Sequence, residues 1–379
     1  NASTTCSLGT LTATAGAGSI SYTGGSVSAA ASCVIIVDVT TSGSGTLVNT
    51  TGDLTSSLGN SGSATASLKV PTLGFDSPLS GDDIVNAAEA TTVTLSGTTS
   101  LIEDGQSVSV SVTDSASGTA SGSATVSSDA WNLVIDLSGL SDGSLNLTAD
   151  VSDAAGTPTP QASASLTLDT DQPALSFDNP LAGDNIVSAA EAGSLTISGG
   201  AAGLVDGRSV SLVITDSASA TVSGSTTVSS DSWSLVVDLS ALSDGTLSLT
   251  ADATDAAGNP VDQASTSLEL DLNTPSGYSA SFDQDPVNSS NETAVSFTFA
   301  SAEVGAQYDY TISSTGGGSP VTGSGTIASA SDQITGLDLS GLGDGTLTLS
   351  ATLTDSAGQV GSAASDTAAK DTSRPTVTL

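Results

Sequence analysis

The sequence contains no histidine and no methionine, and only two of its 379 residues are cysteine. Without histidine, the chain cannot assemble a Ser-His-Asp triad or a Cys-His pair. It also lacks a glycine-rich phosphate loop that ends in lysine. Hydrolases and nucleotide-dependent enzymes of these designs are therefore excluded, and we expect a protein that is not an enzyme.

Basic residues are scarce as well. The chain has 4 lysine and arginine residues against 40 aspartate and glutamate residues, which gives a formal charge of −36. This charge repels nucleic acids and anionic lipids. Because no apolar run approaches the roughly 20 residues that span a bilayer, we expect no direct membrane insertion in this segment. With 37% hydrophobic residues, the chain should nevertheless fold.

What the sequence does contain is internal repetition. Residues 177–187 (FDNPLAGDNIV) restate residues 75–85 (FDSPLSGDDIV), and residues 344–347 restate residues 244–247 (DGTL). Prolines recur at the junctions, at positions 71, 173, 275 and 375. We therefore expect an N-terminal segment (1–70), repeat 1 (71–171), repeat 2 (172–272), a divergent repeat 3 (273–372) and the first strand of a further unit (373–379).

Alternation of apolar and polar residues with period two predicts the fold of each repeat. Residues 209–214 (SVSLVI) and 246–251 (TLSLTA) show this pattern, and about seven such runs occupy each repeat. The prediction is an all-β chain of tandem immunoglobulin-like antiparallel β-sandwiches in an extended string. Trp131 and Trp233 should fill the cores, and Phe297 and neighbouring aromatics should replace the missing tryptophan in repeat 3, where Gln333 stands.

The N-terminal segment differs in kind, because it lacks the repeat signatures and carries both cysteines, Cys6 and Cys33. A lone pair of cysteines in a chain without histidine favours a disulfide and an oxidising compartment, although two unpaired buried thiols remain an alternative. At some 70 residues the segment is short for a sandwich. We expect a partial β-sandwich whose opening strands are missing from a fragment or are supplied by a neighbouring chain.

Acidic residues recur at the turns and linkers, without basic partners, as calcium sites require. If the turns after alternate strands meet at one end of each sandwich, they place two sets of acids at the two repeat junctions. The alternative is that these residues only form Asx-turns and keep the surface soluble. The first set is Asp82, Asp83, Glu89, Asp142, Asp169, Asp171, Asp206 and Asp255, and the second is Asp184, Glu191, Asp244, Asp271 and Asp355.

Residues 136–145 (DLSGLSDGSL), 238–247 and 252–259 (DATDAAGN) resemble the bacterial immunoglobulin-like tandem repeats of giant surface adhesins and biofilm-associated proteins. This resemblance covers residues 71–372. It implies extended stalks, and it implies interdomain calcium held by linker and turn acids, here Asp169, Asp171 and Asp271. The N-terminal segment is similar to the C-terminal part of another bacterial extracellular β-sandwich repeat, in which both cysteines lie in one sandwich.

The leading hypothesis is therefore a stalk or spacer segment of a secreted bacterial adhesin or biofilm-matrix protein, located outside the cell or on its surface and stiffened by Ca²⁺. Its partners would be further repeats in the same or neighbouring chains and an unknown surface target. The alternative is a self-assembling filament or surface-layer subunit, in which the strand at 374–379 completes the first domain of a neighbour. A carbohydrate-binding array using Tyr308 or Tyr310 is a third possibility, weakened by the shortage of aromatic residues, 3% of the chain.

Overall fold

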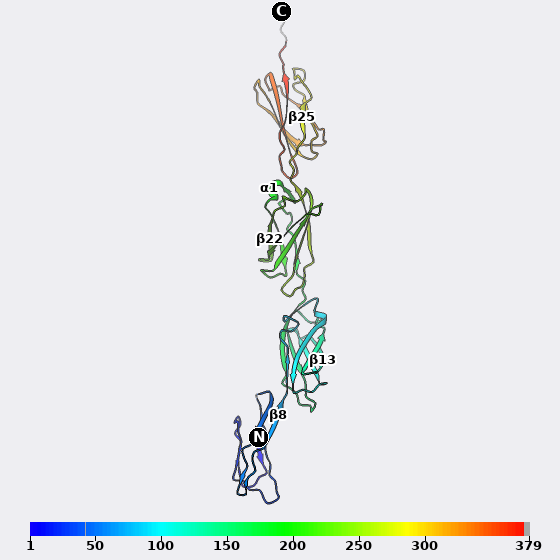
Figure 1. The fold of residues 1–379 in the computed structure, drawn as a ribbon. Helices are drawn as coiled ribbons and strands as arrows, with labels where there is room; N and C mark the ends of the chain where they lie inside the picture. The colour runs from blue at the N-terminus through cyan, green and yellow to red at the C-terminus, as the bar shows by residue number, and fades with distance from the viewer. Residues whose placement is uncertain (42, 375–379) are drawn as a thin grey trace, which may run out of the picture. The chain divides into compact units, whose positions relative to one another are not determined.

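The computed structural model describes residues 1–41 and 43–374. The predicted strand at 373–379 lies mostly outside these residues. The chain divides into two compact units, Asn1–Asp169 and a second unit that begins at Thr170. The regular elements of the described residues are β-strands, apart from one short α-helix and one 3₁₀ turn (Figure 1). None of the helices in the described residues is both long and apolar enough to cross a membrane.

The N-terminal segment consists of four separate two-stranded antiparallel sheets. Cys6 and Cys33 are joined by a disulfide, with their Cα atoms 4.7 Å apart. None of the described residues between 1 and 70 is buried, and large apolar side chains such as Leu58 and Val39 face solvent. The segment therefore has no hydrophobic core of its own. Its paired strands are β1 (Ala2–Thr4) with β4 (Ile35–Val37), β2 (Thr10–Thr12) with β3 (Ser21–Thr23), β5 (Gly45–Thr50) with β8 (Thr65–Val70), and β6 (Thr55–Ser56) with β7 (Gly59–Asn60).

Repeat 1 is a sandwich of a three-stranded and a five-stranded sheet. The order is β14-β11-β9 in one sheet and β10-β16-β15-β12-β13 in the other. Strand β10 runs parallel to β16, and the remaining pairs are antiparallel. The strands are β9 (Thr72–Phe75), β10 (Ile84–Asn86), β11 (Val93–Ser100), β12 (Ser107–Thr113), β13 (Thr119–Thr125), β14 (Ala130–Ile135), β15 (Gly143–Asp150) and β16 (Ala162–Asp169).

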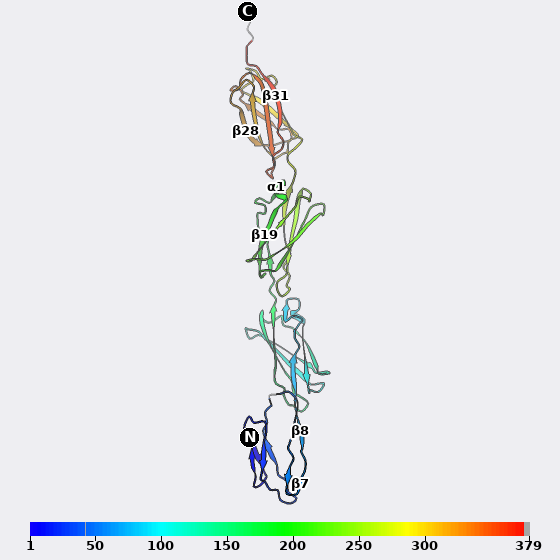
Figure 2. The same ribbon diagram turned by 60° about the vertical axis from the view of Figure 1, so that its left-hand side comes forward.

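Repeat 2 has the same two sheets, β17-β19-β22 and β18-β24-β23-β20-β21 (Figure 2). Repeat 2 also has one short helix, α1 (Ala189–Ala192), and repeat 1 has a short 3₁₀ turn, η1 (Ala90–Thr92), in its place. The strands are β17 (Ala174–Leu175), β18 (Ile186–Ser188), β19 (Leu195–Ala202), β20 (Ser209–Thr215), β21 (Thr221–Thr227), β22 (Ser232–Val237), β23 (Gly245–Ala253) and β24 (Ala264–Asp271).

Repeat 3 keeps this topology with one strand fewer, in the sheets β25-β26-β29 and β28-β27-β30-β31. The parallel strand of the other repeats is reduced to a bridge between Val287 and Lys370. The strands are β25 (Ser279–Phe282), β26 (Val295–Ala300), β27 (Gln307–Ser314), β28 (Val321–Thr326), β29 (Gln333–Leu337), β30 (Gly345–Thr354) and β31 (Ala364–Lys370). The predicted class of tandem immunoglobulin-like sandwiches is thus confirmed.

Each repeat has its own hydrophobic core between its two sheets. The alternation in the sequence accounts for it, because Val210, Leu212 and Ile214 of β20 are buried while the residues between them are exposed. Trp131 and Trp233 are 3% and 2% exposed, which confirms their role as core residues.

In repeat 3, aromatic side chains of β26 and β27 fill the core in place of the tryptophan. Phe297 and Phe299 of β26 are fully buried, Tyr310 is 9% exposed, and the ring centroids of Phe297 and Tyr310 lie 5.2 Å apart. Ile334 pairs with Phe297 and takes the position of the tryptophan, because the register shifts between Val295 and Phe297. The expectation that Gln333 stands there is wrong: Gln333 is exposed and donates to the Asp283 carboxylate at 2.8 Å. The predicted replacement of the tryptophan by neighbouring aromatics is therefore confirmed.

Candidate functional site

In the first turn of repeats 1 and 2, acidic side chains accept hydrogen bonds from the backbone. A carboxylate oxygen of Asp82 accepts from the Ile84 N–H at 3.1 Å, and Asp184 accepts from the Ile186 N–H at 2.9 Å. Asp83 accepts in the same turn from the Leu79 N–H at 2.6 Å. These contacts are Asx-type turns, in which a short acidic side chain binds the backbone a few residues away.

The glutamates that follow are also bound to the backbone. Glu89 Oε2 accepts from the Asn86 N–H at 3.1 Å, and Glu191 Oε2 accepts from the Ser188 N–H at 2.9 Å and from its hydroxyl at 2.8 Å. Ser188 and Glu191 form a capping box at the start of α1. One oxygen of each glutamate therefore satisfies a backbone donor.

The turn that follows β23 in repeat 2 and β30 in repeat 3 carries the most buried acids of the predicted sets. Asp255 and Asp355 are 5% and 6% exposed. The first accepts from the Asn259 N–H at 2.8 Å and from its side-chain amide at 2.9 Å, and the second accepts from the Gln359 N–H at 2.8 Å. In this way a five-residue turn is closed around each carboxylate.

The structure brings three acids of the second set together at the end of repeat 2. Partial burial raises the pKa of Asp271 above its ordinary value, and the negative charges of Asp355, Asp244 and Glu269 raise it further, against a lowering by the Asn273 N–H. Burial, Asp355 and Asp271 likewise raise the pKa of Glu303. Asp184 and Glu191 are not among the charges that act on Asp271. This end therefore carries concentrated, mutually repelling negative charge.

One uncharged residue of repeat 3 connects these groups. The Gln359 side-chain amide donates to the backbone oxygens of Asp271 and Asn273 at 3.0 and 3.1 Å, and its oxygen accepts from the Ala189 N–H at 3.2 Å. Asp244 accepts from the Leu272 N–H at 2.9 Å and from the side-chain amide of Asn273. We call the residues Asp244, Asp271, Asp355 and Gln359 the acidic junction.

Sequence reasoning missed Gln359, because it considered only charged residues as ligands. The sequence did contain a signal. Repeats 1 and 2 have Thr157 and Asn259 at the position of Gln359, and the glutamine side chain is longer than either. Within the described residues, no group of three or more histidine, cysteine, aspartate or glutamate side chains has the geometry to hold a metal ion. The acids of the junction are close enough to repel, but they do not converge on one point.

The first predicted set is split between the two compact units. Asp82, Glu89, Asp142 and Asp169 belong to the first unit, and Asp171, Asp206 and Asp255 to the second. Within the second unit, Asp206 accepts from the Ser230 N–H at 2.7 Å, and Asp171 is exposed. A calcium site at this junction stays a prediction.

The fold defines a series of immunoglobulin-like sandwiches, and comparisons with known proteins extend this result. Residues 1–70 match a family described as a domain of unknown function, DUF7933. No curated protein matches the chain. Among solved structures, the chain is similar to a tetra-tandem repeat in the extending region of a large adhesion protein, with 29% identity, a TM-score of 0.36, and coverage of 98% of this chain and 91% of that one.

Two further similar structures come from bacterial adhesins. One is a 1.5-MDa bacterial ice-binding adhesin, at 23% identity and a TM-score of 0.40, covering 80% of this chain and 98% of that one. The other is a Ca²⁺-stabilised adhesin with which an Antarctic bacterium binds ice, at 22% identity and a TM-score of 0.42, covering 93% and 88%. The predicted resemblance to large adhesins is confirmed.

Proposed function

We propose that this chain is a stalk segment of a large bacterial surface adhesin, located outside the cell, which holds a binding region at a distance by stacking immunoglobulin-like repeats. The observation that carries the proposal is the repetition itself. Repeats 1 and 2 have the same strand order and separate cores, and only four residues, 170–173, lie between β16 and β17. Short linkers between independent cores are suited to a spacer, because each repeat adds length without new chemistry.

Calcium bound at the acidic junction would stiffen the stalk. Asp244, Asp271 and Asp355 supply hard oxygen ligands, and no basic residue is among the charges that act on Asp271. A carboxylate offers about four lone-pair positions, so those that already accept an N–H can still bind an ion. Burial is the main cause of the raised pKa values of Asp271 and Glu303, and a divalent cation would offset the repulsion from neighbouring acids that raises them further. The same role is proposed for Asp142, Asp169, Asp171 and Asp255, with Asp82, Asp184, Glu89 and Glu191 in support.

The test is small-angle X-ray scattering of the whole chain, with millimolar calcium and then with a chelator. The calcium-braced stalk is supported if the chain is a long and stiff monomer in calcium and a flexible monomer in chelator. The triple variant D244N/D271N/D355N should behave in calcium as the unchanged chain behaves in chelator. The control is D129N/D231N/D309N, which removes the same charge at three exposed positions. The calcium proposal would be refuted if the scattering curve is the same in calcium and in chelator, and the same for the triple variant and the unchanged chain.

A second candidate function is a subunit of an extracellular filament, in which a strand from a neighbouring chain completes the N-terminal segment. The exposed apolar side chains of that segment favour it. Residues 1–70 also carry only two acids and one lysine, so the rest of the chain bears −35 of the −36 formal charge. Association through this segment would therefore meet the least repulsion.

Light scattering at increasing protein concentration separates the two candidates. Filament assembly predicts a molecular mass that rises with concentration, and a loss of that rise when residues 372–379 are deleted. A molecular mass that equals that of one chain at every concentration would contradict assembly, and the stalk proposal would stand. A mass that rises equally with and without residues 372–379 would show that this C-terminal segment is not the completing strand.

A further inference from the structure

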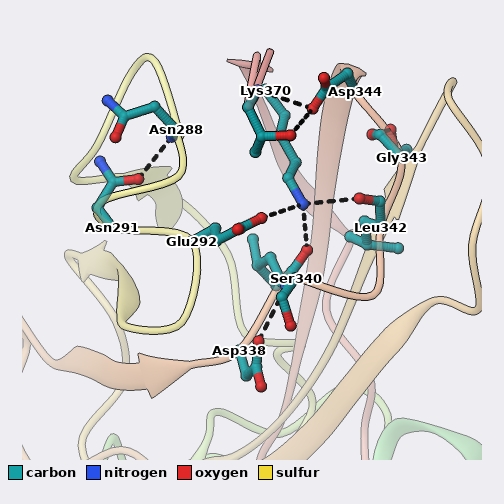
Figure 3. Close-up of polar contacts among 12 residues, drawn as sticks. Asn288, Asn291, Glu292, Asp338, Ser340, Leu342, Gly343, Asp344 and Lys370 are labelled. Atoms are coloured by element: carbon teal, nitrogen blue, oxygen red, sulfur yellow. Dashed lines mark hydrogen bonds and ion pairs between the residues drawn. The ribbon is translucent and has the colours of Figure 1, made fainter. Parts of the chain in front are cut away.

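Repeat 3 contains a buried lysine at the end of its last strand. Lys370 is 4% exposed, although it is one of only four basic residues in the chain. Its ammonium group lies 2.7 Å from the backbone oxygens of Leu339 and Leu342 and 2.9 Å from the Glu292 carboxylate (Figure 3). An ammonium group has three N–H donors, and here three oxygen atoms from two loops surround it.

The other two repeats have leucine at this position. Lys370 pairs with Val287 in parallel and with Gly345 in antiparallel register. Leu270 pairs in the same way with Val187 and Gly245. In repeat 1, Leu168 pairs with Val85 and Gly143. Leu168 and Leu270 are each 1% exposed.

The partner of Lys370 has changed as well. The backbone oxygen of Glu292 accepts from the Leu339 N–H at 2.7 Å, as the oxygen of Ala192 accepts from Leu239 and that of Ala90 from Leu137. Glu292 therefore stands where repeats 1 and 2 have a buried alanine. A leucine and alanine pair in two repeats is a lysine and glutamate pair in the third.

The fold does not require this ion pair. Repeats 1 and 2 build the same sandwich with apolar residues, and a buried ion pair is on average no more stabilising than the apolar pair it replaces. The ion pair leaves the net charge at this end of the repeat unchanged, but it places a cation next to the backbone oxygens of Leu339 and Leu342.

The acids at the ends of repeats 2 and 3 have different charged neighbours. Asp244 adds to the negative charge that raises the pKa of Asp271. The pKa of Asp344, at the equivalent position, is lowered, first by the Thr372 N–H and in smaller part by the positive charge of Lys370. Hydrogen bonds from Ser340, with a contribution from Lys370, lower the pKa of Asp338 as well. A cation is already present at this end.

We infer that Lys370 is a built-in cation, which ties the 339–342 turn and the Glu292 loop to β31 and makes this end of repeat 3 independent of divalent ions. It would do here what bound calcium does at the acidic junction, and to that extent the inference rests on the proposed function. The ligands of this cation are chemically those that calcium uses, two backbone carbonyls and a carboxylate.

Hydrogen exchange of the whole chain, read by mass spectrometry, tests the inference. Residues 337–342 and 364–370 should exchange at the same rate in calcium and in chelator. If the proposed function is right, residues 268–273 of the acidic junction should exchange at least tenfold faster in chelator. A chelator effect at 337–342 would overturn the inference. No effect at 268–273 would count against calcium bracing alone, and the variants below would then decide the role of Lys370.

The decisive variant is Lys370→Ala, which leaves the Glu292 carboxylate and two carbonyl oxygens facing an empty space. If Lys370 replaces a metal ion, K370A should exchange at least tenfold faster at 337–342 in chelator, and millimolar calcium should restore most of the protection. The double variant K370A/E292A, without the carboxylate, should not respond to calcium. K69A removes the same charge from an exposed residue and should change nothing.

Absence of calcium rescue in K370A would overturn the inference, whether repeat 3 stays folded or unfolds in both conditions. Repeats 1 and 2 have separate cores and provide internal references in the same sample. The double variant K370L/E292A restores the pair found in repeats 1 and 2, so it should fold with protection within about threefold of the unchanged chain. K370L alone should lose protection, because the Glu292 carboxylate is left without a cation.

Discussion

Trp233 lies across Gly199, its partner in the neighbouring strand, with the indole nitrogen donating to the backbone oxygen of Ser176 at 3.2 Å. A Cβ atom on Gly199 would lie 1.8 Å from that oxygen and 3.0 Å from the indole nitrogen. Gly97 and Trp131 have the same arrangement in repeat 1. Glycine is therefore required here by the close approach of a neighbouring backbone and a ring.

Replacing Gly199 by alanine should destabilise repeat 2 by about 1–3 kcal/mol, the usual cost of overpacking a core. Gly193 ends α1 with φ −72° and has no atom within 4 Å of an added Cβ, so G193A should be neutral or slightly stabilising. Urea unfolding in a W131F background makes Trp233 fluorescence report on repeat 2 alone. Equal midpoints for G199A and G193A would show that the strand pair can move apart to make room.

Asp216 should make the stability of repeat 2 depend on pH. Its carboxylate is bound by the backbone N–H of Ser243 at 2.9 Å, of Ala220 at 2.8 Å and of Ala218 at 2.9 Å. The Ser243 contact contributes most to lowering the pKa of Asp216 below 3.8. Because the folded form holds its proton less tightly, this contribution is fully present above about pH 4 and is lost as the pH falls through the folded pKa.

D216N should therefore unfold at lower urea than the W131F parent at pH 7, with the difference shrinking towards pH 2.5. The control D231N changes an exposed acid in the same repeat. If the urea midpoints of D216N and its parent differ by the same amount at pH 7 and at pH 2.5, the loss of stability comes from the changed hydrogen-bonding geometry of the amide and not from the lost charge.

Asp271 should have the opposite dependence. Its pKa is raised by burial and by neighbouring acids, so the folded form binds the proton more tightly and stability falls as the pH rises through the folded pKa. In chelator at pH 7, D271N should raise the urea midpoint of repeat 2, and the gain should disappear near pH 3.5. The measurement is again Trp233 fluorescence in the W131F background. With saturating calcium the sign should reverse if the ion binds Asp271.

The disulfide should stabilise the N-terminal segment more than any single apolar side chain does, because no described residue of that segment has a buried side chain. Cys6 and Cys33 are 27 residues apart, and a loop of that length corresponds to roughly 3–4 kcal/mol on the chain-entropy model. C6S/C33S should lose hydrogen-exchange protection in 1–70 while residues 71–374 are unchanged. Retained protection in 1–70 would show that strand pairing alone holds the segment.

Much of the fold was predictable because it depends on local patterns. The alternation around Val210 and Leu212 specifies a half-buried strand, and the offset that relates Trp131 to Trp233 specifies repeated cores. Phe297 and Ile334 stand in repeat 3 where repeat 2 has Gly199 and Trp233, and this exchange was predicted only as a refilling of volume. Which strand supplied the ring depended on register, which the sequence alone does not give.

The candidate site was harder to predict, because its contacts join residues far apart in the chain. Gln359 binds the backbone of Asp271, 88 residues away, and no local pattern indicates that pairing. The turn role of Asp82 was foreseen as the alternative to metal binding, and the structure shows that hydrogen bond. The capping role of Glu191 was not foreseen. Lys370 was visible in the sequence as a lysine at a leucine position, but only the fold places Glu292 beside it.

The parallel pairing of β18 with β24 has a mechanical consequence. These strands lie near the two ends of repeat 2 in the sequence, yet Val187 pairs with Leu270 in the same sheet. A force that pulls the ends of the repeat in opposite directions would slide the two strands past each other. It would strain the hydrogen bonds between them together, and not one after another as in a hairpin opened from its end. The rate at which a repeat unfolds under tension would then depend on the few hydrogen bonds between β18 and β24, because the force acts on them first.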